Sequence, residues 1–191
     1  LPARLDSMSR PPSWTPLAYE PLADCVVFRV GREYSRSPRN HAVYDFYRLE
    51  SSDWVNIIPL TPDDEVVMVT QYRHGSGCVI LETPGGMVDP GEEPAAAAAR
   101  ELLEETGYRA ESIESLGDVN PNPALFGNRL HCFVARDVCW EQAIQNGERE
   151  ETSVELVPRS ELSAKILSGE IDHALVLAAL HRLALVEASP S

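Results

Sequence analysis

The chain has 191 residues, of which 43% are hydrophobic and 24% are charged. These are ordinary values for a globular protein of one domain, or of one domain with a small added unit. Its formal net charge of −14 argues against nucleic acid as a partner, because binding a phosphate backbone requires clustered lysine and arginine. The same charge disfavours an anionic membrane surface, and no apolar run approaches the roughly 18 residues that a membrane-spanning helix needs.

The first 21 residues predict an extended arm, because prolines stand at positions 2, 11, 12, 16 and 21. Met8 follows shortly after Leu1, and one expectation is that residues 1–7 are a remnant of cloning. The start of the chain also lacks the apolar core of a signal peptide. Residues 22–50 predict a small antiparallel subdomain, with strands at 25–30 and 41–49 around a turn in YSRSPRN.

Residues 51–188 predict a second and larger domain. Apolar, strand-forming runs predict strands at 54–60, 66–71, 112–119, 130–135 and 152–157. Helices are expected at 94–106, 161–167 and 171–186. The segment 140–149 is interpreted as a polar connection, and NPNPALFGN at 120–128 as a loop between two strands.

The helix at 94–106 has clear boundaries in the sequence. Pro94 suits the first turn of a helix, the alanines that follow have the highest helix propensity, and Gly107 stands where a helix usually ends. Helical spacing predicts a buried stripe made of Ala95, Ala98, Ala99 and Leu102. Another face is then shared by three carboxylates, those of Glu101, Glu104 and Glu105.

Three carboxylates on one helical face call for a cation. Like charges at this spacing repel one another by a few tenths of a kcal/mol per pair. Arg100 is the cation beside them, and Glu92 approaches from the preceding loop. Oxygen ligands suit Mg²⁺ or Mn²⁺, whose coordination shell is completed by water and substrate phosphate. The pattern favours a divalent metal site, with a solvated acidic helix face as the alternative.

Residues 86–108 read GMVDPGEEPAAAAARELLEETGY, in the order G-x5-E-x7-R-E-x-x-E-E-x-G. This stretch resembles the signature of the Nudix hydrolases, except that Tyr108 stands where an aliphatic residue is usual. The resemblance implies an α/β fold, namely an α/β/α sandwich with a mixed sheet. It also implies an enzyme that uses Mg²⁺ or Mn²⁺ to hydrolyse a nucleoside diphosphate linked to another group. It implies that Arg100 orients the carboxylates and that Glu92 braces the loop. The metal ligands implied are Glu101, Glu104, Glu105 and the carbonyl of Gly85.

A second resemblance lies just before the signature. Residues 66–86 read VVMVTQYRHGSGCVILETPGG and resemble the branch of the family that hydrolyses ADP-ribose and other nucleotide sugars. Pro123, fifteen residues beyond Tyr108, matches a proline that this branch tends to carry. The resemblance covers roughly residues 45–185 and implies a small nucleotide sugar, with ADP-ribose favoured, as the substrate.

Other substrates stay open. Gly85-Gly86 replaces the Ala-Gly often found in this branch, and VYDFYRLE lacks the paired basic residues that some members use, so GDP-mannose and ADP-glucose remain candidates. Nudix enzymes of nucleoside triphosphates or dinucleoside polyphosphates share the signature. A non-catalytic nucleotide-sensing module usually has a broken signature, whereas this chain keeps every carboxylate.

A further catalytic or metal-binding glutamate is expected in GEREETSVELVP, where branch members commonly place one on a mobile loop. Glu150 is the best positional match, and Glu148 and Glu151 are the alternatives. Hydrolysis needs a base for the attacking water, although a metal can supply much of that activation. The base is therefore assigned to Glu150 or a neighbour, against the competing interpretation of a solvated acidic loop. The number of metal ions stays open.

Five residues are candidates for substrate binding. Arg73 follows a strand and is expected to hold a phosphate or ribose with a bidentate fork, with a surface ion pair as the alternative. Gly86 is expected to line the substrate site by resemblance. Phe28 is a candidate for stacking on the base, unless it packs in a core or an interface. The rigid loop around Pro123, together with Asn128, is expected to frame the terminal sugar.

Compartment and assembly are also predicted. Neither a CxxC pair nor metal-ligand spacing occurs among Cys25, Cys78, Cys132 and Cys139. Buried free thiols are expected, as suits a reducing cytoplasm. His74 and His131 are interpreted as structural. The branch uses a segment like residues 22–50 for dimerisation and to complete the partner's nucleotide pocket, so a homodimer is expected from the resemblance.

Overall fold

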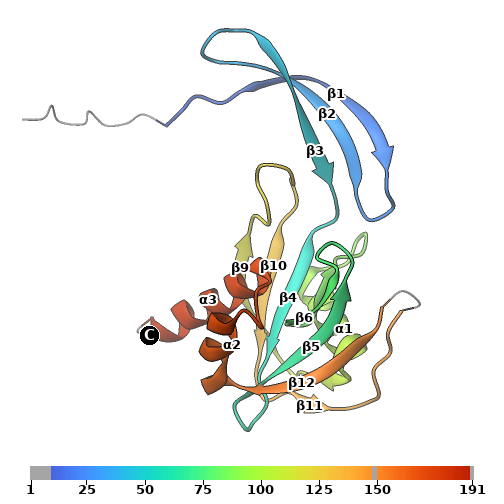
Figure 1. Cartoon of the computed structure of the whole chain (residues 1–191), viewed down its shortest axis with the longest axis vertical. Helices are drawn as coiled ribbons and strands as arrows, with labels where there is room; N and C mark the ends of the chain where they lie inside the picture. The colour runs from blue at the N-terminus through green and yellow to red at the C-terminus, as the bar shows by residue number, and fades with distance from the viewer. Residues whose placement is uncertain (1–9, 148–149, 190–191) are drawn as a thin grey trace, which may run out of the picture. The chain divides into compact units, whose positions relative to one another are not determined.

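The computed structural model of the chain describes residues 10–147 and 150–189 (Figure 1). The chain divides into two compact units, one of residues 1–51 with 124–127 and one of residues 52–123 with 128–191. The predicted cloning remnant, residues 1–7, lies outside the described residues.

The N-terminal unit is a three-stranded antiparallel sheet. Its strands are β1 (Thr15–Asp24), β2 (Arg29–Arg36) and β3 (Val43–Glu50), in the order β1-β2-β3. The predicted extended arm is therefore wrong from residue 15 onward. Proline is tolerated in β1 because this is an edge strand, and the β1–β2 register shifts at both Pro16 and Pro21.

The strand expected at 25–30 begins later than predicted. Residues 25–28 form a tight turn in which Cys25 N–H donates to the Phe28 carbonyl at 2.9 Å. Val26 has a φ of +69° in this turn and is 88% exposed, so its β-branched side chain did not mark a strand. The following strand continues to Arg36, which is three residues into the predicted turn, while residues 38–40 form a turn as predicted.

The larger unit contains the remaining elements. Its helices are α1 (Pro94–Thr106), α2 (Leu162–Ser168, after a 3₁₀ turn at Arg159–Glu161) and α3 (Ala174–Ala188). Its strands are β4 (Trp54–Pro59), β5 (Glu65–Arg73), β6 (Cys78–Glu82), β7 (Gly85–Met87), β8 (Tyr108–Arg109), β9 (Ile113–Val119), β10 (Leu130–Ala135), β11 (Cys139–Trp140) and β12 (Thr152–Pro158).

These strands form two main sheets. The first has the order β7-β4-β10-β9 and is mixed, because β4 and β10 run parallel while the outer pairs are antiparallel. The second is antiparallel with the order β12-β5-β6. The short strands β8 and β11 pair with each other in a separate sheet. Trp140, the first residue of the predicted polar connection 140–149, therefore lies in a strand.

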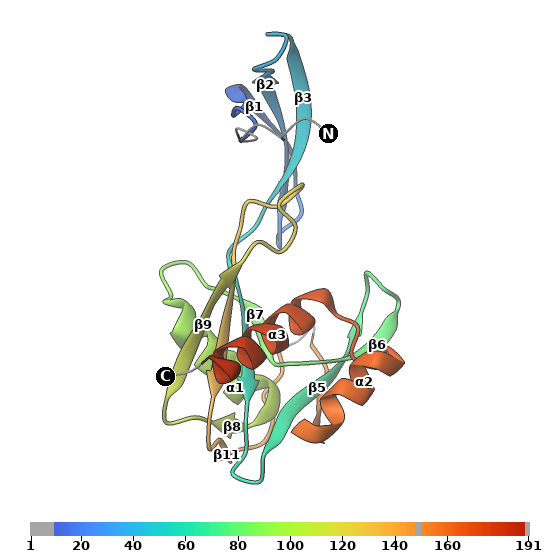
Figure 2. The same cartoon turned by 90° about the vertical axis from the view of Figure 1, so that its left-hand side faces the viewer.

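Alternation along the central strands creates a core on each face of the sheets. Ile57 of β4 and Val67 of β5 pack in the core with α1, whereas Ile58 and Met68, one residue further, pack in the core with α3. In Figure 1, α2 and α3 lie to the left of the sheets and α1 to the right. Figure 2, seen from that left-hand side, has α3 in front of the strands. The predicted α/β/α sandwich is confirmed.

The buried side of α1 differs from the predicted stripe. Ala98 and Leu102 are buried as predicted, but Ala95 and Ala99 are exposed. The side facing the sheet also carries Ala97, Glu101, Glu105 and Thr106. An alanine-rich helix presents small apolar residues on several faces, so periodicity alone did not identify the packed one. Two of the three carboxylates therefore lie on the inward side of the helix.

The cysteines and helices add two findings. All four cysteines are free, but only Cys132 is buried, while Cys25, Cys78 and Cys139 are exposed, so the expectation of buried thiols is wrong for these three. Over the described ranges, no helix has the length and apolar character needed to cross a membrane.

Candidate active site

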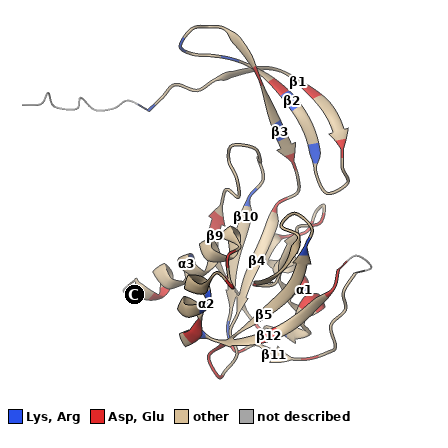
Figure 3. Cartoon of the chain, in the orientation of Figure 1, with Lys and Arg blue, Asp and Glu red and all other residues tan. Residues whose placement is uncertain are grey.

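Helix α1 carries the three signature glutamates, and part of its ribbon has the colour of acidic residues in Figure 3. Its ends are defined as predicted, since Pro94 occupies the first turn and Gly107 closes the helix in the left-handed region at φ +73°. Glu101 and Glu105 are one helical turn apart and are 7% and 3% exposed. Glu104 lies at the edge of this face, with 44% of its side chain exposed.

Arg100 links the signature helix to the loop before it. Its Nε and Nη2 donate to the two carboxylate oxygens of Glu92, each at 3.0 Å, and Nη2 also donates to the Met87 carbonyl at 3.1 Å. Its Nη1 reaches Glu101 Oε1 at 2.9 Å and Glu104 Oε2 at 3.2 Å. The guanidinium therefore gathers three carboxylates around one charge. Its hydrogen bonds hold the pKa of Glu92 below the usual range.

Glu105 is the most deeply buried carboxylate of the three. Burial raises its pKa to about 8, and the negative charges of Glu101 and Glu150 act in the same direction. The N–H of Gly85 donates to Glu105 Oε2 at 3.0 Å and opposes the shift. This carboxylate thus has a main-chain donor and no side-chain cation at hydrogen-bond distance within the described residues.

Two glycines let strand β7 pass close to the main chain of β4 and to the Glu101 carboxylate. A Cβ on Gly85 would lie 2.2 Å from the Val55 carbonyl oxygen, and one on Gly86 would lie 2.2 Å from Glu101 Oε1. The Val55 oxygen belongs to the main chain, so position 85 requires glycine, whereas a side chain at position 86 would displace the end of the Glu101 side chain. The Gly85 N–H bonds to Glu105 and a Cβ on Gly86 would meet Glu101, so the predicted ligand position and the predicted substrate-site position both lie beside α1.

The charge of Glu150 acts on two of these carboxylates. The side chain is exposed, and its charge raises the pKa of both Glu101 and Glu105, although burial is the largest cause in each case. The Glu150 N–H donates to the Gly147 carbonyl at 3.1 Å. Glu151 is exposed, and Glu148 lies outside the described residues.

Arg73 is paired with a residue that the sequence analysis did not select. Its Nε donates to Glu82 Oε1 at 2.7 Å, and Glu82 is only 1% exposed. His173 Nδ1 lies 2.9 Å from the other oxygen of Glu82. The glutamate could have been noticed as a charged residue ending the apolar run CVILE, whereas nothing in the sequence connects it to His173.

The other predicted substrate residues are not gathered at α1 by any contact described here. Phe28 belongs to the N-terminal unit and Pro123 is exposed in the loop after β9. Asn128 is buried, and its Nδ2 donates to the Ser52 carbonyl at 2.9 Å. Their roles in substrate binding stay predictions. His131 lies 3.0 Å from Asp53 Oδ2, a contact that joins β10 to the start of β4 and agrees with its structural interpretation.

The donor set suits a hard divalent cation. Within residues 10–147 and 150–189, no three His, Cys, Asp or Glu side chains already converge as a metal site. Glu101 and Glu104 face Arg100, and Glu105 faces the Gly85 N–H. All the candidate ligand atoms are nevertheless oxygens, which Mg²⁺ and Mn²⁺ prefer. A buried carboxylate with a pKa near neutrality also gains from a nearby cation.

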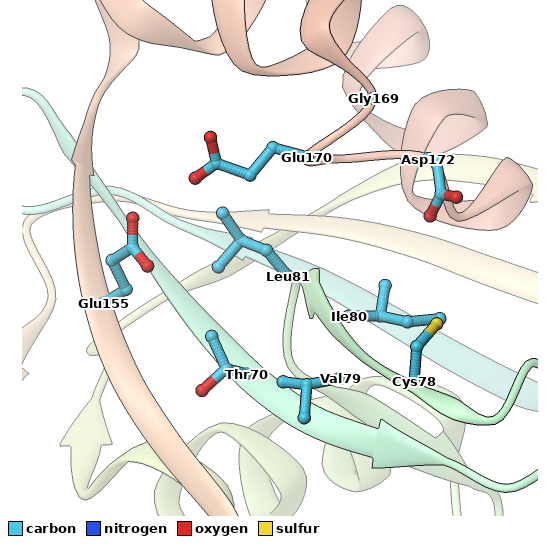
Figure 4. Close-up of a pocket in the computed structure, with 9 residues that line it drawn as sticks. All are labelled: Thr70, Cys78, Val79, Ile80, Leu81, Glu155, Gly169, Glu170 and Asp172. Carbon is cyan, nitrogen blue, oxygen red and sulfur yellow. The ribbon is translucent and has the colours of Figure 1, made fainter.

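A separate open pocket lies away from these carboxylates (Figure 4). Thr70 and Leu81 in its lining belong to the opposite face of β5 and β6 from Val69 and Glu82, because successive strand residues alternate. The nine lining residues include three carboxylates and no basic side chain, so the pocket lacks an obvious site for an anionic nucleotide.

Comparison with known proteins identifies the family of this chain. Residues 52–180, well over half of the sequence, match the NUDIX domain. The chain belongs to the Nudix family. It is 29% identical over 166 residues to an ADP-ribose pyrophosphatase of Mycobacterium tuberculosis, a match covering 85% of this chain and 79% of that protein.

Two further relatives agree with this placement. The chain is 31% identical over 125 residues to the ADP compounds hydrolase NudE of Escherichia coli, which covers 65% of each protein. The crystal structure of an ADP compounds hydrolase superposes with a TM-score of 0.79 at 25% identity, covering 91% of this chain and 93% of that one. The match spans 65% of the length of NudE and 44% of another curated relative, so the activity of the whole protein remains a proposal.

Proposed function

We propose that this Nudix protein is a divalent-metal-dependent pyrophosphohydrolase of nucleoside diphosphate sugars, with ADP-ribose as the preferred substrate and AMP and ribose 5-phosphate as products. One observation carries the proposal. The signature helix buries Glu101 and Glu105 beside Gly86 and Gly85, and Arg100 bonds to Glu101 and Glu104. The ADP-ribose pyrophosphatase among the relatives supports this substrate class.

The residues of the site divide the work of hydrolysis. Glu101, Glu104, Glu105 and the Gly85 carbonyl would hold Mg²⁺ or Mn²⁺, and Arg100 would keep the first two carboxylates in place. When bound, the cation neutralises phosphate charge and lowers the pKa of the attacking water. Glu150 would accept the proton as that water adds to one phosphorus and the phosphoanhydride bond breaks.

Assembly as a homodimer belongs to the same proposal. The N-terminal unit exposes aromatic side chains, and Trp14 contacts Tyr44 and Phe46 edge to face with ring centroids 5.7 and 5.2 Å apart. Exposed apolar patches of this kind mark interaction surfaces. A second copy of the chain is the proposed occupant, and Phe28 of the same unit is then a candidate for contact with the base.

The test is hydrolysis of a substrate panel with Mg²⁺, followed by identification of the products. The panel holds ADP-ribose, ADP-glucose, GDP-mannose, a nucleoside triphosphate and a dinucleoside polyphosphate. Glu105→Gln should lose at least about 10²-fold in kcat, as is typical when a group that stabilises transition-state charge is lost. It should still fold, because the amide oxygen can accept the Gly85 hydrogen bond.

Glu111→Gln, an exposed position beyond α1, is the control and should match the wild type. Wild-type kinetics for Glu105→Gln would contradict the metal-site assignment. Exclusive cleavage of the triphosphate or the dinucleoside polyphosphate would move the chain to another class of Nudix enzyme. Absence of turnover on the whole panel would favour a nucleotide-sensing module.

A further inference from the structure

The Glu82 carboxylate is buried outside the metal-binding set, and the proposed hydrolysis does not use it. Only 1% of the residue is exposed, and it ends strand β6 three residues before Gly85. Each of its two oxygens has one side-chain partner, Arg73 Nε at 2.7 Å and His173 Nδ1 at 2.9 Å. The three residues come from β5, β6 and the position that caps α3.

Stability alone does not explain this group. A buried ion pair usually contributes little more than apolar residues of similar size, because desolvation offsets the attraction. Burial by itself would raise the pKa of Glu82, yet the hydrogen bonds from His173 and Arg73 hold that pKa below its usual value. The carboxylate is therefore kept charged in a place where a leucine or valine would fit the strand pattern.

The strand register places this group on the face of the sheet that carries the candidate active site. Glu82 is the register partner of Val69, and paired residues share a face. Arg73 lies four residues beyond Val69 on β5 and so shares that face too. Val67 on the same face packs in the core with α1. The charge of Arg73 lowers the pKa of the Glu105 carboxylate, as expected for two groups on the same side of the sheet.

The contacts of Arg73 leave its two terminal nitrogens, Nη1 and Nη2, available to bind a ligand. Nε is bonded to Glu82, whereas Nη1 and Nη2 have no hydrogen-bond partner among the described residues. Arginine binds phosphate and carboxylate oxygens through paired terminal donors. A long side chain that is already held in place loses less conformational entropy when it binds a ligand.

We propose that Glu82 and His173 are positioning residues for Arg73, holding its guanidinium through Nε so that Nη1 and Nη2 face an anionic oxygen of the bound nucleotide sugar. This inference rests on the proposed function, because it assigns Arg73 to substrate binding. Neither positioning residue touches the substrate. His173 fixes the second oxygen of Glu82 and thereby links the start of α3 to the substrate site.

A double-mutant cycle tests the inference with the full-length protein, Mg²⁺ and whichever panel nucleotide the wild type cleaves. Arg73→Gln and Glu82→Gln should each raise KM about tenfold while kcat changes little, since ground-state and transition-state binding are lost together. The double variant should show the same tenfold rise rather than a hundredfold one, because Glu82 acts only through Arg73. Glu82→Asp should recover part of the loss.

Glu155→Gln is the matched control, since it removes a carboxylate of the neighbouring strand β12 that is paired with Lys165 and should leave both constants unchanged. Additive effects in the cycle, or a fall in kcat at constant KM, would overturn the inference and leave the proposed function standing. If thermal unfolding shows that Glu82→Gln is not folded, His173→Gln replaces it in the cycle, with the same expected results. A wild type without turnover on the panel would instead contradict the proposed function.

Discussion

Replacing Gly86 by alanine tests whether the Glu101 carboxylate must occupy its observed place. An ideal Cβ at position 86 would lie 2.2 Å from Glu101 Oε1 and 2.5 Å from Glu101 Cδ. Ordinary van der Waals contact begins at 3.4 Å, so the nearer oxygen must retreat by about 1.2 Å. This oxygen is the end of a flexible side chain and can move without the backbone. It would leave the 2.9 Å contact with Arg100.

The expected loss is large for activity and small for folding. Misplacing a catalytic group by about 1 Å can cost about 10²-fold in rate, which corresponds to about 2.7 kcal/mol of transition-state stabilisation. Overpacking a core costs about 1–3 kcal/mol, within the stability of about 5–15 kcal/mol of a typical domain. Gly86→Ala should therefore remain folded and lose about a hundredfold in kcat/KM.

The assay combines kcat/KM for ADP-ribose with Mg²⁺ and thermal unfolding of the same preparations. Gly75→Ala is the control, because a Cβ there meets nothing within 4 Å, and it should match the wild type in both measurements. Gly85→Ala should lose stability as well as activity, because its Cβ would meet the Val55 main-chain oxygen at 2.2 Å, where only a backbone shift gives relief. Wild-type kcat/KM in Gly86→Ala would refute the reasoning.

Three further predictions concern pH, metal and assembly. Hydrogen bonds from His173 and Arg73 outweigh burial and hold the pKa of Glu82 below 4.5. The ionised carboxylate therefore stabilises the fold above pH 4.5. This stabilisation is lost as the pH falls through the pKa of Glu82 in the folded state. The difference in melting temperature between wild type and Glu82→Gln should shrink below that pH, and a constant difference would contradict this. Adding Mg²⁺ to chelator-treated protein should stabilise the wild type by about 2.7 kcal/mol at 100 times Kd, and by less in Glu105→Gln; equal shifts in thermal unfolding would count against the metal site. Phe46→Asp should convert a dimer to a monomer in analytical ultracentrifugation, and a monomeric wild type would exclude that interface.

Local sequence determined the elements whose signals lie within a few residues. Helix α1 has the predicted bounds because Pro94, the alanine run and Gly107 act within single turns of the chain. Strand β10 also matches its prediction at 130–135, where a short apolar run is buried on both faces. The order and spacing of the signature residues identified the family, because metal chemistry requires them on consecutive turns of one helix.

Tertiary structure decided which chemically similar positions face inward and which distant groups meet. Ala97 rather than Ala95 packs against the sheet, because the sheet and not the helix pattern selects the buried side of α1. Pro16 could enter strand β1 only because that strand lies at a sheet edge. Glu82 and His173 are 91 residues apart in the chain, and only the meeting of β6 with the start of α3 brings them within a hydrogen bond. Contacts of that kind depend on how whole helices and strands pack together, and a local sequence pattern does not predict this packing.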